Sequence, residues 1–210
     1  MRHLFPRYFL PTMLCCFLAV RAEAQDTFTE PGSMKSFPKQ VTFEYAGKTY
    51  TLKATGAAEQ KHSRGDRVRQ TMTLAHYMEN PPAANDLDAT ETVRKDKGAK
   101  QFTFVFASDN DDGRFAQRLE RSLQSSIKPE TSTKLKNSIA EFVACFKGNF
   151  KANDQYTVRW LPDGKTEVVI AGQPPKLIAN LAFAPFYWGI WFGLDSPVSS
   201  YDLLSLLTSF

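Results

Sequence analysis

The chain has 210 residues, of which 42% are hydrophobic and 23% are charged, and its formal net charge is +4. This size and composition fit one globular domain or at most two small ones. The charges are nearly balanced and form no basic stripe along an element, so the sequence excludes a nucleic-acid-binding surface. No internal repeat is evident.

The N-terminal residues 1–24 have the three parts of a secretory signal peptide. The basic segment MRHLFPR precedes the apolar segment YFLPTMLCCFLAV, and Ala-Glu-Ala at 22–24 supplies a cleavage pattern before Gln25. The apolar segment is short and contains Pro11, which argues against a retained membrane anchor. We therefore expect an exported protein that is periplasmic or secreted after cleavage. Three arginines and one glutamate leave with the peptide, which lowers the net charge by two.

The residues that follow the cleavage site are expected to form a flexible leader over 25–39 and one domain over 40–210. Alternating apolar and polar residues predict four strands in the first half of that domain. These strands are 41–45 and 50–56, which form a hairpin around Gly47, then 68–78 and 102–107. The basic residues 61–69 are interpreted as a solvated loop, and 81–100 as a surface connection.

The pattern changes to a helical period after residue 113. Apolar residues spaced by three or four predict helices over 115–127 and 135–146. Cys145, the only cysteine beyond the signal peptide, lies in the second stripe and is expected to be a buried, inert thiol. Pro162-Asp163-Gly164 marks a hairpin, and 201–207 predicts a terminal helix. This order of elements predicts an α+β fold, in which an antiparallel sheet is covered on one face by a layer of helices.

The aromatic segment around 183–192 is the most unusual part of the sequence. It lies in an uncharged run from Leu177 to Leu194 that comes close to the roughly 20 apolar residues of a membrane span. Asn180 and Pro185 interrupt this run. A helix that is apolar nearly all round is otherwise a buried one. We expect a core helix and no transmembrane span in the mature chain.

The same segment carries a resemblance to a known family. Phe186 to Leu207, with Ile-Trp-Phe-Gly at 190–193, Pro197 and a closing Leu-Leu-Ser-Leu-Leu, resembles the C-terminal signature of the chalcone isomerase-like family. The plan of residues 40–207 is similar to that of the family's exported bacterial branch. The resemblance implies an open-faced sandwich with a ligand cleft between the sheet and its helices.

The resemblance also locates the positions that carry chemistry in the family's enzymes. There, an arginine polarises and orients the substrate with the help of threonine and tyrosine hydroxyls. Residues 56–80 resemble that stretch without gaps, and they place Gln60 at the arginine position and Met72 at the threonine position. A looser alignment places Phe115 at a catalytic tyrosine and Ser122 at an asparagine. Loss of one such donor costs about 10²–10³ in rate, so the resemblance implies a non-catalytic member.

The family's fatty-acid-binding members pair the same arginine with the ligand carboxylate. Because Gln60 is uncharged, the cleft is expected to suit an apolar or lipid-like ligand, with a fatty acid possible, better than a small carboxylate. The candidate cleft residues are Gln60, Met72, His76, Phe115 and Ser122.

Other interpretations stay open at this stage. For His76, a hydrogen-bonded core imidazole is the alternative to a place in the cleft. One alternative function is an envelope interaction protein with a filled core and no ligand. Another is an isomerase-like enzyme that uses Lys61, His62 or His76 as a base. The protein partner is unknown.

No metal or cofactor is expected. His62 and His76 have no ligand partner at a recognised metal spacing. The acidic run 109–112 is similar to a calcium loop, but Arg114 takes the sixth position, where the sharp turn requires glycine. We interpret the run as a solvated turn before the first helix.

Overall fold

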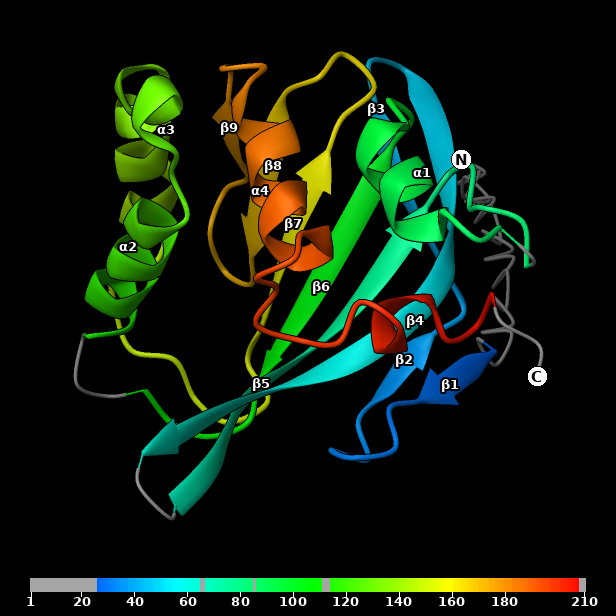
Figure 1. Ribbon diagram of the computed structural model, residues 1–210, viewed down its shortest axis with the longest axis horizontal. Helices are drawn as coiled ribbons and strands as arrows, with labels where there is room; N and C mark the ends of the chain where they lie inside the picture. The colour runs from blue at the N-terminus through cyan, green and yellow to red at the C-terminus, as the bar shows by residue number, and fades with distance from the viewer. Residues whose placement is uncertain (1–25, 65–66, 85, 111–113, 208–210) are drawn as a thin grey trace, which may run out of the picture.

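A computed structural model describes residues 26–64, 67–84, 86–110 and 114–207 (Figure 1). Its centre is a seven-stranded antiparallel sheet in which the strands follow one another in chain order. They are β3 (Gln40–Tyr45), β4 (Lys48–Arg64), β5 (Arg67–Met78), β6 (Lys100–Phe106), β7 (Gln155–Trp160), β8 (Thr166–Ile170) and β9 (Lys176–Ile178). The expected signal peptide lies outside the described residues.

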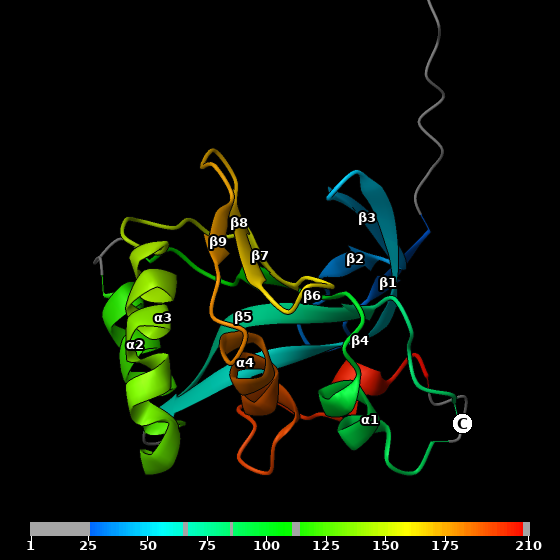
Figure 2. The same ribbon diagram turned by 90° about the horizontal axis from the view of Figure 1, so that it is seen from above.

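The helices lie together on one side of this sheet (Figure 2). They are α1 (Ala89–Lys95), α2 (Phe115–Ser125), α3 (Ser132–Ala144) and α4 (Phe183–Phe192), with 3₁₀ turns η1 (Pro129–Thr131) and η2 (Asp202–Leu204). The predicted α+β class, an antiparallel sheet with helices on one face, is therefore confirmed. The terminal helix expected over 201–207 is reduced to η2.

The main core lies between the sheet and the helices. Alternate residues of β5 and β6 face it, among them Leu74, Phe102 and Phe104, each with no exposed surface. The aromatic helix α4 packs into this core with Trp188 fully buried and Tyr187 1% exposed. Within the described residues, no helix is long and apolar enough to span a membrane.

The expected flexible leader is ordered in the structure. Residues from 27 to 38 form a two-stranded sheet of β1 (Thr27–Thr29) and β2 (Ser36–Pro38). Phe37 is 2% exposed and joins a second apolar cluster on the sheet face away from the helices. The Glu30 carboxylate accepts hydrogen bonds from the backbone N–H groups of Gly32 and Ser33 and so holds the connecting turn. Burial of Phe37 explains why this polar segment is not loose.

Two further segments depart from the sequence expectations. The connection 81–100 contains the short helix α1, whose C-terminal end is held by the fully buried Lys100. The Lys100 ammonium donates to the carbonyl oxygens of Val93 and Asp96, and it lies 4.0 Å from the centroid of a Trp160 ring. The supposed loop 61–69 instead extends the paired strands β4 and β5, apart from residues 65 and 66, which the structure does not describe.

Candidate ligand-binding site

A cavity of about 1030 Å³ opens between the sheet, α2 and α4. It therefore lies next to the aromatic helix, along the face that carries Tyr187, Ile190 and Trp191. Its volume is at the upper end of the range of about 300–1,000 Å³ that is typical of small-molecule sites. The space beside α4 is consequently not completely filled by side chains.

The inner wall of the cavity is apolar and buried. Met72 of β5 and Phe106 of β6 come from the sheet, Phe115 from the start of α2, and Trp191 from α4. Tyr156 of β7 also lines the wall, and its ring stacks on that of Phe104 of β6 at a centroid distance of 4.4 Å. These side chains are each less than 9% exposed. Such a wall suits hydrocarbon rather than a charged group.

A bulge in β5 shapes the polar part of the wall. Gln60 lies opposite Met72 and Lys61 lies opposite Gln70, so Thr71 is an extra residue between them. The Thr71 hydroxyl lies 3.1 Å from the Gln60 carbonyl oxygen and 3.3 Å from its side-chain Oε1. Both residues line the cavity. This pair offers hydrogen bonds without a charge.

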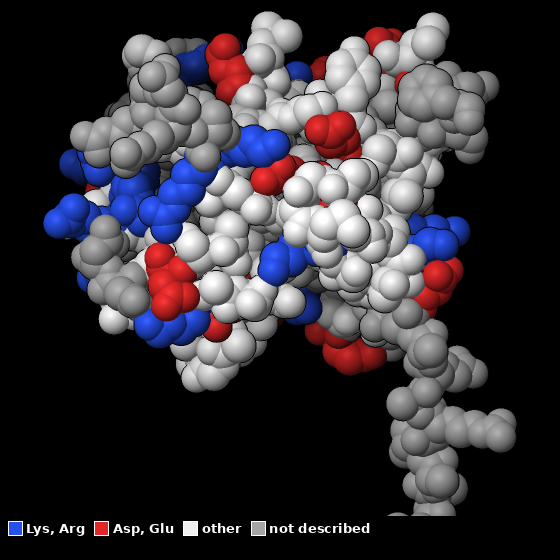
Figure 3. All heavy atoms as spheres, turned by 90° about the horizontal axis from the view of Figure 1, so that it is seen from below, with Lys and Arg blue, Asp and Glu red and all other residues white. Residues whose placement is uncertain are grey.

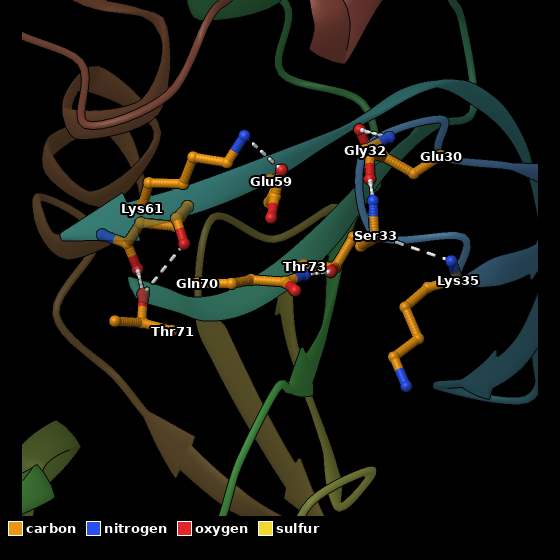
Figure 4. Close-up of polar contacts among 10 residues, drawn as sticks. Glu30, Gly32, Ser33, Lys35, Glu59, Lys61, Gln70, Thr71 and Thr73 are labelled. Carbon is orange, nitrogen blue, oxygen red and sulfur yellow. Dashed lines mark hydrogen bonds and ion pairs between the residues drawn. The ribbon is translucent and has the colours of Figure 1, made fainter. Parts of the chain in front are cut away.

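Lys61 does not replace the family's arginine. Its ammonium is paired with the Glu59 carboxylate at 2.7 Å. Figure 4 shows the Lys61 side chain directed toward Glu59, which lies on the same strand two residues away. Lys61 also lines the cavity, but the Glu59 carboxylate compensates the charge of its ammonium.

His76 is a core residue and does not line the cavity, which corrects its listing among the cleft candidates. It has no exposed surface, its Nδ1 lies 2.8 Å from Thr55 Oγ1, and its Nε2 lies 3.0 Å from Trp188 Nε1. Burial lowers the pKa of His76 well below its ordinary value of 6.5, and the Lys100 charge acts in the same direction. An imidazole with both nitrogens engaged cannot serve as a base in the cleft.

The other four candidates all line the cavity: Gln60, Met72, Phe115 and Ser122. Sequence reasoning missed the aromatic wall formed by Tyr156, Tyr187 and Trp191, because pairing of β7 with β6 and the docking of α4 bring these residues together. It also missed Arg118 and Arg121 on α2. The available signal was their spacing, because these two arginines lie within about one helical turn of Leu119 and Ser122, which also line the cavity.

Other candidate chemistry is not supported by the geometry. Cys145 is half-buried rather than fully buried, and burial raises the pKa of its thiol, which disfavours the reactive thiolate. Within the part of the chain that the structure describes, no group of three or more His, Cys, Asp or Glu side chains is placed to hold a metal ion. The acidic run 109–112, which we interpreted as a solvated turn, falls partly on residues 111 and 112, which lie outside that part.

Comparison with known proteins gives the family. A model described as chalcone isomerase-like matches residues 36–203. The chain belongs to the chalcone isomerase-like family. This match covers both the Gln60 segment and the aromatic helix of the family signature.

Among solved structures, the fold is similar to that of an Arabidopsis thaliana fatty-acid binding protein, with a TM-score of 0.67 and 12% sequence identity. The similarity covers 87% of this chain and 96% of the plant protein. No curated protein sequence matches the chain. At this identity the structural likeness establishes the shared fold.

Proposed function

We propose that this chain is a non-catalytic member of the chalcone isomerase-like family that binds an apolar, lipid-like ligand in the cavity between the sheet and α2 and α4. The observation that carries the proposal is the cavity itself, about 1030 Å³ in volume with an inner wall of buried aromatic and aliphatic side chains. Burial of each methylene group in such a site contributes about 0.8 kcal/mol. A hydrocarbon chain is therefore the ligand group that gains most binding free energy from this cavity.

The residues at the family's catalytic positions support a binding role over the namesake reaction. Gln60 donates without charge, and Met72 and Phe115 donate no hydrogen bond. The cavity thus has no fixed cation at the position where the enzymes stabilise a developing negative charge. The plant protein of similar fold is described as a fatty-acid binding protein, which supports lipid binding as the use of this fold here.

We also propose that the protein acts outside the cytoplasm, after removal of residues 1–24. This proposal rests on the sequence of that segment alone: a basic start, a short apolar stretch and a small-x-small cleavage pattern. N-terminal sequencing of the protein from its native host tests it. A mature protein that begins near Gln25 supports export, whereas an intact N-terminus in the cytoplasm contradicts it.

Extraction of the natively purified protein tests the binding proposal. Mass spectrometry of the extract should find a lipid or another apolar molecule in stoichiometric amount. In addition, the affinity for added n-alkanols should rise about fourfold with each methylene group until the cavity is full. A protein that is purified empty and binds none of the alkanols would rule out the proposed function.

A further inference from the structure

The entrance of the cavity differs in charge from its interior. Arg69 of β5 and Arg118 and Arg121 of α2 line the cavity, and all three are exposed. Figure 3 shows lysine and arginine side chains gathered on one side of the face viewed from below, where α2 and the far end of the β4–β5 hairpin lie. The mouth is therefore basic, whereas the inner wall is apolar.

The arginines come from two sides of the mouth. Arg118 and Arg121 lie about one helical turn apart on α2, together with Ser122, which also lines the cavity. Arg69 comes from β5, where it pairs in register with His62 of β4, and it lines the same cavity. The helix and the sheet thus both contribute guanidinium groups to the lining of the cavity.

The hydrogen bonds of Arg69 and Arg121 leave their charges unpaired. Arg69 Nη2 donates to Ser108 Oγ at 2.7 Å, and Arg121 Nε donates to the Gln117 carbonyl oxygen at 3.4 Å. Both acceptors are neutral. Among the described residues, neither arginine forms an ion pair with a carboxylate. Each guanidinium has five N–H donors, so most of them remain available to an anion.

Among the described residues that line the mouth, Asp109 carries the one carboxylate, and it is already engaged. Asp109 lines the cavity, but its carboxylate accepts a hydrogen bond from the Ala152 backbone N–H at 2.8 Å and faces the Lys151 ammonium at 3.4 Å. The Ala152 hydrogen bond is the main cause that lowers the pKa of Asp109. The Asp109 carboxylate is therefore already engaged by the Ala152 N–H and the Lys151 ammonium.

From this arrangement we infer that the cavity takes an amphiphile in one orientation, with an anionic head group at the arginine mouth and its hydrocarbon chain against the inner wall. The inference rests on the proposed function and adds the ligand's charge and direction. An anion placed at the inner wall would lose its hydration beside Phe106, Phe115 and Trp191 without gaining a cation. At the mouth, charge-assisted bonds to arginine replace part of that hydration.

The test compares three probes with the same chain: dodecanoate, dodecyl phosphate and dodecanol. Both anions are expected to bind roughly tenfold or more tightly than the alcohol, because they add charge-assisted hydrogen bonds to the same hydrocarbon burial. Raising the salt concentration should weaken the anions and leave dodecanol nearly unchanged, since exposed charges are screened. The tighter of the two anions identifies the head group as carboxylate or phosphate.

The matched variants are Arg69→Gln with Arg121→Gln, and Arg94→Gln with Lys95→Gln as a control. Arg94 and Lys95 are exposed on α1 and do not line the cavity, so both doubles remove the same charge. The mouth double should lose most of the preference for the anions while it keeps its dodecanol affinity, and the control double should keep both. Equal binding of all three probes, or equal anion affinity in the two doubles, overturns the inference but leaves the proposed function intact. Failure of every probe to bind contradicts the proposed function itself.

Discussion

The indole Nε1 of Trp188 lies 3.0 Å from Nε2 of His76, and this contact joins α4 to β5 inside the core. An indole nitrogen only donates, so Nε2 accepts and the neutral imidazole carries its proton on Nδ1. Nδ1 then donates to Thr55 Oγ1 at 2.8 Å, and Thr55 donates to the Leu203 carbonyl oxygen at 2.7 Å. The chain of hydrogen bonds thus connects α4, β5, β4 and η2.

His76→Phe should destabilise the protein by about 1–3 kcal/mol, because the variant keeps an aromatic ring beside Phe102 and Phe192 but leaves the Trp188 N–H without an acceptor. Urea denaturation measures the free energy of unfolding. His62→Phe, at an exposed position, is the control and should change stability little. An unchanged unfolding free energy for His76→Phe would show that the network contributes nothing.

The same histidine gives a pH dependence with a defined sign. Burial lowers the pKa of His76 below 6.5, so the unfolded state takes up a proton at a pH where the folded state does not. Below pH 6.5 this difference reduces stability by up to about 1.4 kcal/mol per pH unit. Urea titrations between pH 7 and pH 5 should show this loss in the wild type and a smaller slope in His76→Phe. Equal slopes of unfolding free energy against pH in the wild type and His76→Phe would contradict the lowered pKa of His76.

Tyr77 is a buried polar residue whose replacement should have the opposite effect on stability. Its hydroxyl is buried with no hydrogen-bond partner among the described residues, and burial raises its pKa. Tyr77→Phe should therefore leave stability unchanged or raise it by about 1 kcal/mol at neutral pH. Above pH 10 the folded wild type holds a proton that the unfolded chain releases, so its stability falls with pH. Thermal melting at pH 7 and pH 10.5 should show a smaller alkaline loss in Tyr77→Phe; destabilisation at pH 7 would count against this account.

Gly56 allows η2 to dock on β4. A Cβ atom at this position would lie 2.3 Å from the Asp202 carbonyl oxygen and 2.7 Å from the Leu203 carbonyl carbon. Gly56→Ala should consequently push η2 away and cost about 1–3 kcal/mol. Hydrogen exchange of the Leu206 N–H, which donates to the Thr55 carbonyl oxygen at 2.9 Å, reports the displacement directly. Gly172→Ala is the comparison, because the added Cβ would have open space there but the backbone φ is +76°. This variant measures the effect of backbone strain without the steric contact. Unaltered exchange in Gly56→Ala would refute the proposed docking role.

Gln60→Arg tests the position that distinguishes this chain from the family's enzymes. Gln60 lines the cavity next to the bulge residue Thr71, so an arginine there adds a fixed positive charge at the polar part of the wall. A charge-assisted pair contributes about 1.5–3 kcal/mol. In the Arg69→Gln, Arg121→Gln background, where the mouth no longer holds the head group, calorimetry should therefore show fatty-acid affinity raised tenfold or more by Gln60→Arg. Affinity for a neutral ligand should stay level or fall. Met72→Thr is the control and should change little, because its hydroxyl has no charge to organise. A folded Gln60→Arg variant with unchanged fatty-acid affinity would show that this side chain does not face the ligand.

Local patterns were sufficient for most of the fold. The period of two in β5 and β6 and the period near four in α2 and α3 come directly from which residues face the core, so the sequence alone predicted them. The sequence did not reveal α1, because its C-terminal support is Lys100, a residue type that is rarely buried. The burial of Phe37 likewise depends on a sheet face that forms only when distant strands pair.

The candidate site was predictable where it follows the linear pattern of one segment. Gln60 and Met72 lie opposite each other across β4 and β5, and an ungapped resemblance was enough to select both. His76 has the same strand parity as Met72, but its neighbour Trp188 is 112 residues away, so its hydrogen-bonded core role required the tertiary structure. The mouth arginines on β5 and α2 come to line one cavity only in the folded chain.

Filling the cavity is the most direct test of the claim that the protein binds a lipid-like ligand there. Leu119 of α2 lines the cavity, and Leu119→Trp should occupy part of its volume. Leu177→Trp on β9 adds the same side chain at an exposed position outside the cavity and serves as the control. The measurement is the binding of a fluorescent fatty acid, with circular dichroism to confirm folding. The account predicts strong binding by the wild type and Leu177→Trp and at least a tenfold loss in Leu119→Trp; equal binding by all three folded proteins would contradict it.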